Sequence, residues 1–297
     1  MINDMKSARA RLALSLLNHQ MKKARTMSVR EARDFFEKST ATRRWPRIQT
    51  VIDDTVKNIP IRIYQNKHSN DHGIILFFHG GGFTLGSINT HDSIARLLCR
   101  YTNRSVISVG YSLAPEHKHP TPIIEGLGVL DQLPVLSEKY GFNIQNITLA
   151  GDSAGGFIAL HIALRTNVPI DSLVLLYSMI QPDATTESMK KFGNSYYVTA
   201  ANIHSFWKQY LSDEPITPLT NHTIDMLPPT LIITAEYDVL HDEARDLYAL
   251  MRNQGKACQY EEAKGKWHGF MHWPTAMSGR IKMLGVIKKF IAMHQTR

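Results

Sequence analysis

A serine between two glycines is the first feature of this sequence that could do chemistry. The pentapeptide Gly151–Gly155 places Ser153 directly after the apolar run Ile147–Ala150 and before a helix-forming stretch. A strand-to-helix turn this tight crowds the positions two residues either side of its apex and lifts the serine hydroxyl to a helix N-terminus. The pattern predicts Ser153 as a nucleophile for acyl transfer. The alternative is an ordinary turn with an N-capping serine.

A glycine-rich segment earlier in the chain could stabilise the negative charge that such an attack creates. His79-Gly80-Gly81-Gly82 follows the apolar run Ile74–Phe78. Backbone N–H groups can approach an oxyanion closely where side chains are absent. The expected donors are Gly81, Gly82 and Ala154, the residue after the serine. A flexible turn is the alternative, while a phosphate loop lacks its G-x-x-x-x-G-K-[ST] pattern.

Ser153 needs a base, and the base needs an orienting acid. His268 opens the segment His-Gly-Phe after the last expected strand, and Asp238 lies in the loop beyond the strand Leu231–Thr234. Their order along the chain, serine then acid then histidine, is that of hydrolases with this turn. The competing residues are His272 and His241 for the base, with Glu236 and Asp242 for the acid, although Asp242 is better explained as the cap of the next helix.

Apolar runs alternate with helical patterns over most of the chain. This order predicts an α/β fold whose mostly parallel central sheet is flanked by helices, because strands buried on both faces read as continuous apolar runs. The expected strands are 48–56 and 59–64, paired antiparallel through Asn58, then 74–78, 106–109, 147–150, 173–177, 231–234 and 259–262. The expected helices between them are 93–101, 154–165 and 242–254.

Two further segments predict a helical cap. Residues 1–45 read as two amphipathic helices, the second opened by a capping box of Ser28 and Glu31 with Phe36 on its apolar face. The interval of about 180–228 has no clear strand but contains a helical pattern over 200–211. We therefore expect a catalytic domain over 46–297 that carries this interval as a cap insertion, with residues 1–45 as N-terminal cap helices.

Composition is typical of a soluble globular protein, and the partner expected from the acyl-transfer chemistry is a small-molecule ester substrate. The net charge of +8 and the pI of about 9.4 suggest a polyanion partner, but no nucleic-acid-binding motif is present, so a solvated basic surface is preferred. Weak peripheral attraction of the basic N-terminus to anionic lipids stays open. Cys99 and Cys258 form no disulfide or metal pattern. The absence of a signal-peptide pattern predicts a cytoplasmic location.

Taken together, these segments resemble the hormone-sensitive lipase family of α/β-hydrolase esterases. The shared segments are HGGGFTLGS at 79–87, YSLAPEH at 111–117, GDSAGG at 151–156, LPPTLIITAEYDVLHDE at 227–243 and HGF at 268–270. The resemblance implies a triad of Ser153, Asp238 and His268, and an oxyanion hole of Gly81, Gly82 and Ala154. It also implies a cap over an acyl or alcohol pocket. The family usually has Arg where this chain has Ser112.

The function expected from the sequence is a serine carboxylesterase for short- to medium-chain esters that needs no metal or organic cofactor. The alternatives are a peptide or thioester hydrolase with the same triad, and a ligand-binding member of the fold, which loss of the base would have favoured. A homodimer stays open. The expected pocket aromatics are Phe83, Tyr197, Trp207 and Phe270, with Tyr196 beside them.

Overall fold

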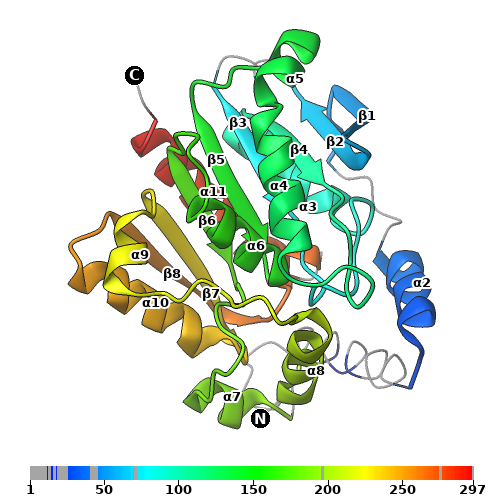
Figure 1. Cartoon of the computed structure of the whole chain (residues 1–297), viewed down its shortest axis with the longest axis vertical. Coiled ribbons are helices and arrows are strands. Elements are labelled where there is room, and N and C mark those ends of the chain that lie inside the picture. Colours follow the sequence, from blue (N-terminus) through cyan, green and yellow to red (C-terminus); the bar gives the residue numbers. More distant parts are fainter. Residues whose placement is uncertain are drawn as a thin grey trace.

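The computed structural model is an α/β sandwich built on one mixed sheet (Figure 1). It describes residues 26–40, 46–67, 69, 72–194, 197–273 and 276–295, together with 12, 15 and 18. The strands are β1 (Thr50–Val56), β2 (Ile59–Gln65), β3 (Ile74–Phe78), β4 (Ser105–Val109), β5 (Ile147–Asp152), β6 (Ser172–Leu176), β7 (Thr230–Tyr237) and β8 (Cys258–Trp267). The helices of the main body are α3 (Asp92–Thr102), α4 (Thr121–Asp131), α5 (Leu133–Tyr140), α6 (Ala154–Ala163), α10 (His241–Asn253) and α11 (Met277–Met293).

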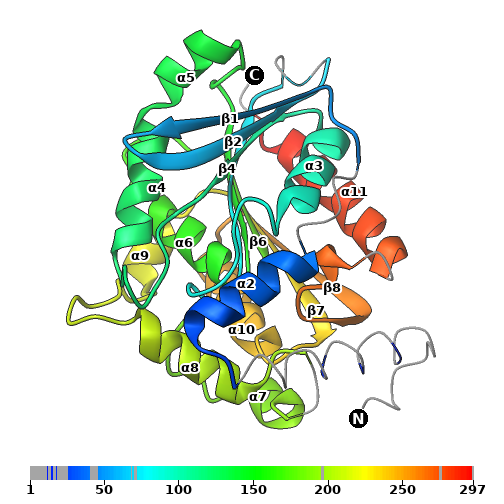
Figure 2. The ribbon, with the colours of Figure 1, turned by 90° about the vertical axis from the view of Figure 1, so that its right-hand side faces the viewer.

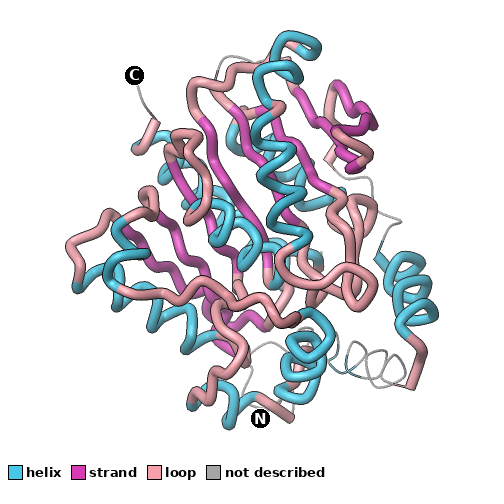
Figure 3. Tube along the Cα trace, viewed as in Figure 1, coloured by secondary structure: helices cyan, strands magenta, loops and turns pink. Residues whose placement is uncertain are grey.

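The strand order is β1-β2-β4-β3-β5-β6-β7-β8. β1 and β2 form an antiparallel pair whose turn brings Val56 opposite Ile59, and β2 is antiparallel to β4. Every later neighbour is parallel. The carboxyl ends of β3, β5, β7 and β8 therefore meet at one edge of the sheet, where α/β folds bind ligands. Figure 3 shows loops gathered between these strand ends and the helix at 200–210.

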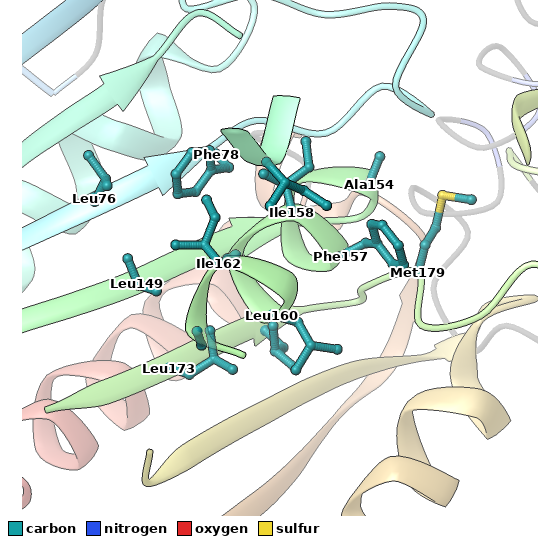
Figure 4. Close-up of a cluster of buried hydrophobic side chains, with 14 of the residues drawn as sticks. Leu76, Phe78, Leu149, Ala154, Phe157, Ile158, Leu160, Ile162, Leu173 and Met179 are labelled. Carbon is teal, nitrogen blue, oxygen red and sulfur yellow. The ribbon is translucent and has the colours of Figure 1, made fainter. Parts of the chain in front are cut away.

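Helices cover both faces of the sheet, as the turned view shows (Figure 2). One face packs under α3 and α11, and the other packs under α4, α6 and α10. β3, β4, β5 and β6 are fully buried along their length. Figure 4 shows Ile158 and Ile162 of α6 on the side of Phe78 of the sheet, whereas Phe157 lies beside Met179. This packing fixes the start of α6, and with it the residue that precedes the helix.

The sequence prediction of the sheet is confirmed, including the antiparallel first pair, with strand ends displaced by a few residues. The largest differences are β7 and β8, which extend to Tyr237 and Trp267 because they pair with each other beyond the apolar runs. The sequence analysis did not predict α4, α5 or α11. Ser112, which replaces the family's usual Arg, donates its N–H and hydroxyl to the Glu125 carboxylate of α4.

The interval 180–228 contains α7 (Glu187–Phe192), α8 (Ala200–Tyr210) and α9 (Asn221–Asp225). Before the sheet lies α2 (Val29–Thr40), which begins with the predicted capping box: Ser28 N–H donates to the Glu31 carboxylate at 2.8 Å, and Glu31 N–H donates back to Ser28 Oγ at 3.3 Å. The helix predicted before α2 lies outside the described residues, apart from 12, 15 and 18. In the part of the chain that is described, no helix has the length and apolarity to cross a membrane.

α2 is held against the loop that follows β3. Arg33 of α2 donates to the carbonyl oxygens of Thr84 and Ala114 at 2.8 and 2.7 Å, and it pairs with Glu116. Ser87 donates to the Glu37 carboxylate at 2.7 Å. α2 also lies beside α8, since the two helices line a common groove (Figure 2). Both helices therefore stand over the carboxyl edge of the sheet.

Candidate active site

Ser153 sits at the apex of the turn between β5 and α6, with φ 52° and ψ −121°. A Cβ on Gly151 would lie 2.2 Å from the Gly155 carbonyl oxygen, and a Cβ on Gly155 would lie 2.0 Å from that of Phe78. Both glycines are therefore required by the close approach that the sequence pattern predicted. Ser153 N–H donates to Leu176 O at 2.9 Å, which ties the strained turn to β6. A strained backbone held from both sides in this way is common at functional sites.

The fold brings Ser153, His268 and Asp238 into one hydrogen-bonded chain. His268 Nε2 lies 3.0 Å from Ser153 Oγ, and His268 Nδ1 lies 2.8 Å from Asp238 Oδ2. The other oxygen of Asp238 accepts from Leu240 N–H at 3.0 Å. The three residues are 7%, 5% and 1% exposed, so bulk water barely competes for these bonds. This geometry allows the imidazole to remove the hydroxyl proton while the carboxylate holds its Nδ1–H tautomer.

The competing residues are engaged elsewhere. Glu236 accepts from Gly265 N–H at 2.6 Å, where it holds an irregularity in the β7–β8 pairing. Asp242 lies in the first turn of α10 rather than at its cap, and its carboxylate accepts from Ser188 N–H at 2.8 Å. His241 Nδ1 lies 3.0 Å from Asp242. Within the described part of the chain none of the three is hydrogen-bonded to Ser153, which leaves His268 and Asp238 as the pair that the geometry favours.

The Gly-rich segment forms a tight turn beside Ser153. Gly81 and Gly82 have φ of 122° and 61°, and the Gly81 carbonyl accepts from Leu85 N–H at 2.9 Å. Ala154 is the first residue of α6, so its N–H has no acceptor within the helix. The segments carrying all three expected N–H donors border the same pocket as Ser153, with Gly81 and Gly82 in its wall. The arrangement suits a carbonyl oxygen that becomes negatively charged.

The pocket above Ser153 is small and mostly apolar. Its cavity volume is about 60 Å³. Its apolar wall consists of Phe36 of α2, Leu85, Tyr197, Val198, and Ile203 and Phe206 of α8. A Cβ on Gly82 would lie 2.2 Å from the ring of Phe206, so this ring packs directly against the Gly-rich turn.

Of the four expected pocket aromatics, the structure places one in the pocket wall. Tyr197 lines the pocket, whereas Phe83, Trp207 and Phe270 do not. Phe83 is fully buried and stacks on Tyr210 with ring centroids 3.8 Å apart, while Trp207 is 2% exposed and packs 5.0 Å from Phe83. Phe270 belongs to the core under α3 and α11. Apolar periodicity identified buried aromatics but not the surface each one meets. Tyr196 lies outside the described residues.

His91, Asp152 and His272 lie around Gly80. The sequence analysis did not assign these three residues a role in holding the Gly-rich turn. Asp152 accepts from Gly80 N–H at 2.9 Å, and its two oxygens lie 3.5 Å from His91 Nε2 and 3.4 Å from His272 Nε2. Burial opposes ionisation of Asp152, but these partners hold its pKa below the ordinary value. Burial, together with the nearby His91, lowers the pKa of His272 to about 4. His272 therefore supports Asp152 rather than Ser153, which removes it as the competing base.

The signal for Asp152 was its position inside the pentapeptide, but the pattern leaves that position unspecified. Its carboxylate positions the amide that precedes Gly81 and Gly82, so it bears on the oxyanion turn. The turn is also held from its other side. Tyr111 Oη donates to the His79 carbonyl at 2.6 Å, and the two rings stack with centroids 4.3 Å apart.

Comparison with known proteins agrees with this geometry. A family model described as alpha/beta hydrolase fold matches residues 75–272. An acetyl esterase of Salmonella schwarzengrund is 31% identical over 233 residues, which cover 74% of this chain and 72% of that protein. An esterase of Pyrobaculum calidifontis has a TM-score of 0.81 at 29% identity, covering 91% of this chain and 95% of its own.

A further neighbour is the ester-hydrolase EH1AB1 from the metagenome of Lake Arreo, in complex with a bipyridine phosphonate derivative. Its TM-score is 0.86 at 25% identity, and the match covers 97% of this chain and 98% of that one. The likeness thus extends beyond the sheet to nearly the whole chain. On these grounds the chain belongs to the hormone-sensitive-lipase-like family of α/β-hydrolases and is a carboxylic ester hydrolase.

Proposed function

We propose that this chain is a serine esterase that cleaves esters of short acyl groups through an acyl-enzyme on Ser153. The observation that carries the proposal is the buried hydrogen-bonded chain from Ser153 through His268 to Asp238. The hydroxyl of serine is a weak nucleophile unless a base of this kind lies within hydrogen-bond reach.

In the first half-reaction, Ser153 Oγ bonds to the ester carbonyl carbon while its proton passes to His268 Nε2. Asp238 stabilises the imidazolium through the Nδ1–H bond. The carbonyl oxygen gains the negative charge and accepts from the N–H groups of Gly81, Gly82 and Ala154. The carbon–oxygen bond to the alcohol then breaks, and the alcohol leaves with the proton from His268.

In the second half-reaction, water takes the place of the alcohol. His268 removes a proton from this water, the hydroxide bonds to the acyl carbon, and the bond to Ser153 Oγ breaks as the serine regains its proton. The products are the carboxylic acid and the free enzyme. Every proton is carried by His268, so the reaction needs no further group.

The preference for short acyl groups is supported by the size of the pocket and by the relatives. About 60 Å³ of room lies beside Ser153, walled by Phe206 and Phe36. The curated relatives at 30–31% identity carry the name acetyl esterase. We extend that acyl preference to this chain, with acetyl and propionyl esters as the best substrates and medium chains as poorer ones.

The test combines labelling with a substrate panel. A fluorophosphonate probe should label the native chain at Ser153, and Ser153→Ala should abolish labelling and lower kcat by about 10⁶ while leaving the thermal transition in place. A panel of acetyl to octanoyl esters, with one amide and one thioester, should show the acetyl or propionyl ester as the best substrate. Substantial turnover by the folded Ser153→Ala chain, or a steep preference for the amide or thioester, would contradict the proposal.

A further inference from the structure

Tyr177 contacts the expected base, although it takes no part in the proton transfers described above. It directly follows β6 and is 1% exposed. The centroid of its ring lies 5.2 Å from that of His268, and the two ring planes are inclined by 67°. Inclined, edge-to-face contacts at this separation are favourable between aromatic rings. Tyr177 is therefore placed to influence the imidazole through packing alone.

The backbone of Tyr177 is strained. Its φ is 37°, a value that Gly adopts freely but that is an outlier for a bulky residue. The residues on both sides of it are bonded to the nucleophile turn: Ser153 N–H donates to Leu176 O at 2.9 Å, and Met179 N–H donates to Ser153 O at 3.1 Å. Tyr177 N–H donates to Ile233 O of β7 at 2.6 Å. A bulky residue held in such a conformation points to a function for its side chain.

The two hydrogen bonds of His268 leave one motion of its ring open. They join Nε2 to Ser153 Oγ at 3.0 Å and Nδ1 to Asp238 Oδ2 at 2.8 Å, and together they define one axis through the imidazole. Hydrogen bonds tolerate some misalignment, so the ring can tilt about this axis. The ring of Tyr177 adds a third contact, which restricts that tilt.

The ring of Tyr177 is itself fixed. It packs on Phe270 of the short 3-10 helix η3 (Phe270–His272), with centroids 5.4 Å apart, and both rings belong to the core under α3 and α11. Burial raises the pKa of Tyr177 well above its ordinary value, so the phenol stays neutral near pH 7. It therefore does not compete with His268 for the proton of Ser153.

We propose that Tyr177 is a positioning residue, whose backbone fixes the turn that carries Ser153 while its ring fixes the orientation of His268. One residue thus sets the geometry between nucleophile and base. Tyr177 does not line the pocket beside Ser153, so it acts through its neighbours rather than on the substrate. The inference rests on the acyl-transfer mechanism proposed above.

Two variants separate the ring of Tyr177 from its backbone. Tyr177→Phe keeps the ring, whereas Tyr177→Leu removes it but leaves a side chain with the same restriction at positive φ. We expect Tyr177→Leu to lower kcat by about 10²-fold, because a misplacement of about 1 Å at the reacting groups has an effect of this size. KM should stay within about threefold, since no contact with the substrate is lost. Tyr177→Phe should keep kcat within about threefold of the native value, because the ring contact persists.

Proton NMR follows the imidazole without any turnover. The Nδ1 proton of His268, which bonds to Asp238, gives a low-field resonance that is identified by its loss in His268→Ala. We expect this resonance to shift or broaden in Tyr177→Leu and to keep its position in Tyr177→Phe. A residue that only contributes to folding stability would leave the resonance of the folded chain unchanged.

The matched control is Phe290→Leu, which removes a buried ring of the same core near the C-terminal end of α11. It should lower the thermal transition, as Tyr177→Leu does, but leave kcat and the resonance unchanged. If Tyr177→Leu does not fold, Tyr177→Met replaces it, because a flexible side chain fills an irregular space more easily.

Native kcat with an unshifted resonance in the folded Tyr177→Leu chain overturns the proposal. A fall in kcat that Phe290→Leu reproduces overturns it as well, and so does an equal loss in Tyr177→Phe, which would assign the effect to the hydroxyl. Failure of a fluorophosphonate probe to label Ser153 in the native chain is a separate outcome, because it would contradict the esterase mechanism itself.

Discussion

We predict that the ring of Phe206, which lines the pocket beside Ser153, limits the length of acyl chain that fits there, and Phe206→Ala tests this. The ring packs so closely on the oxyanion turn that a Cβ at Gly82 would lie 2.2 Å from it. The substitution removes six ring carbons and leaves room for roughly four methylene groups in a close-packed wall. Each buried methylene contributes about 0.8 kcal/mol, so full burial of four would contribute about 3 kcal/mol.

Phe206 is only half-buried, so an acyl chain that takes the place of its ring stays partly exposed to water. Halving the gain gives about 1.5 kcal/mol, or about tenfold in kcat/KM, with about 150-fold as the upper bound. Hexanoyl esters should therefore improve by about 10- to 100-fold relative to acetyl esters. The acetyl ester itself should change by less than about fivefold, because the reacting carbonyl is still held by the oxyanion turn.

The assay compares kcat/KM for acetyl, butanoyl and hexanoyl esters of one alcohol, and for acetyl esters of a series of alcohols. Lys208→Ala, which changes an exposed residue of the same helix, is the matched control. A hexanoyl-to-acetyl ratio that stays within about threefold of the native chain, in a variant with a normal thermal transition, would refute the reasoning. A response confined to the alcohol series would place Phe206 on the leaving-group side of Ser153 instead.

Three other substitutions test the framework around this pocket. Asp238→Asn should lower kcat by about 10⁴ with the fold intact, because the amide favours the wrong tautomer of His268; circular dichroism and steady-state rates check it. Burial raises the pKa of Glu243 to about 8, so this carboxyl is neutral when folded and charged when unfolded near pH 7. Folding stability should therefore fall as pH rises from about 5 to 8, and Glu243→Gln should flatten that fall in thermal melts, whereas an unchanged slope contradicts the assignment. Arg33→Ala should release α2 from Thr84, seen as faster proteolysis within α2 at an unchanged main transition.

The expected triad could be predicted from the sequence because the fold determines where residues at the ends of successive strands lie. Parallel strands present their carboxyl ends at one edge, so residues just after β5, β7 and β8 had to come together there. Ser153 was also marked by glycines whose absence of a side chain is enforced by backbone contacts of 2.0–2.2 Å. Constraints of this kind are local, and they restrict which residue types can occupy a position, so they can be recognised in the sequence.

The residues that form the pocket wall could not be recognised from the sequence in this way. Ile203, Phe206, Trp207 and Tyr210 recur at helical spacing on α8, and the periodicity predicts correctly that they share a buried side. It does not say that Trp207 and Tyr210 face Phe83 in the core while Phe206 faces the serine. A difference of one position, about 100° around the helix, separates core from pocket. That difference depends on how α8 lies over the sheet, which only the tertiary structure supplies.

Asp152 is a second residue whose contacts could not be predicted from the sequence. It stands next to Ser153 within the recognised pentapeptide, yet its partners come from elsewhere: His91 from the start of α3, and His272 from beyond β8. Because neighbouring residues at a strand end point in different directions, Ser153 faces His268 while Asp152 faces Gly80. In the mechanism proposed above, the two residues would therefore act on one carbonyl by separate routes, the serine on its carbon and the aspartate on the turn proposed to receive its oxygen. A substitution at Asp152 should consequently change kcat through the oxyanion turn while fluorophosphonate still labels Ser153.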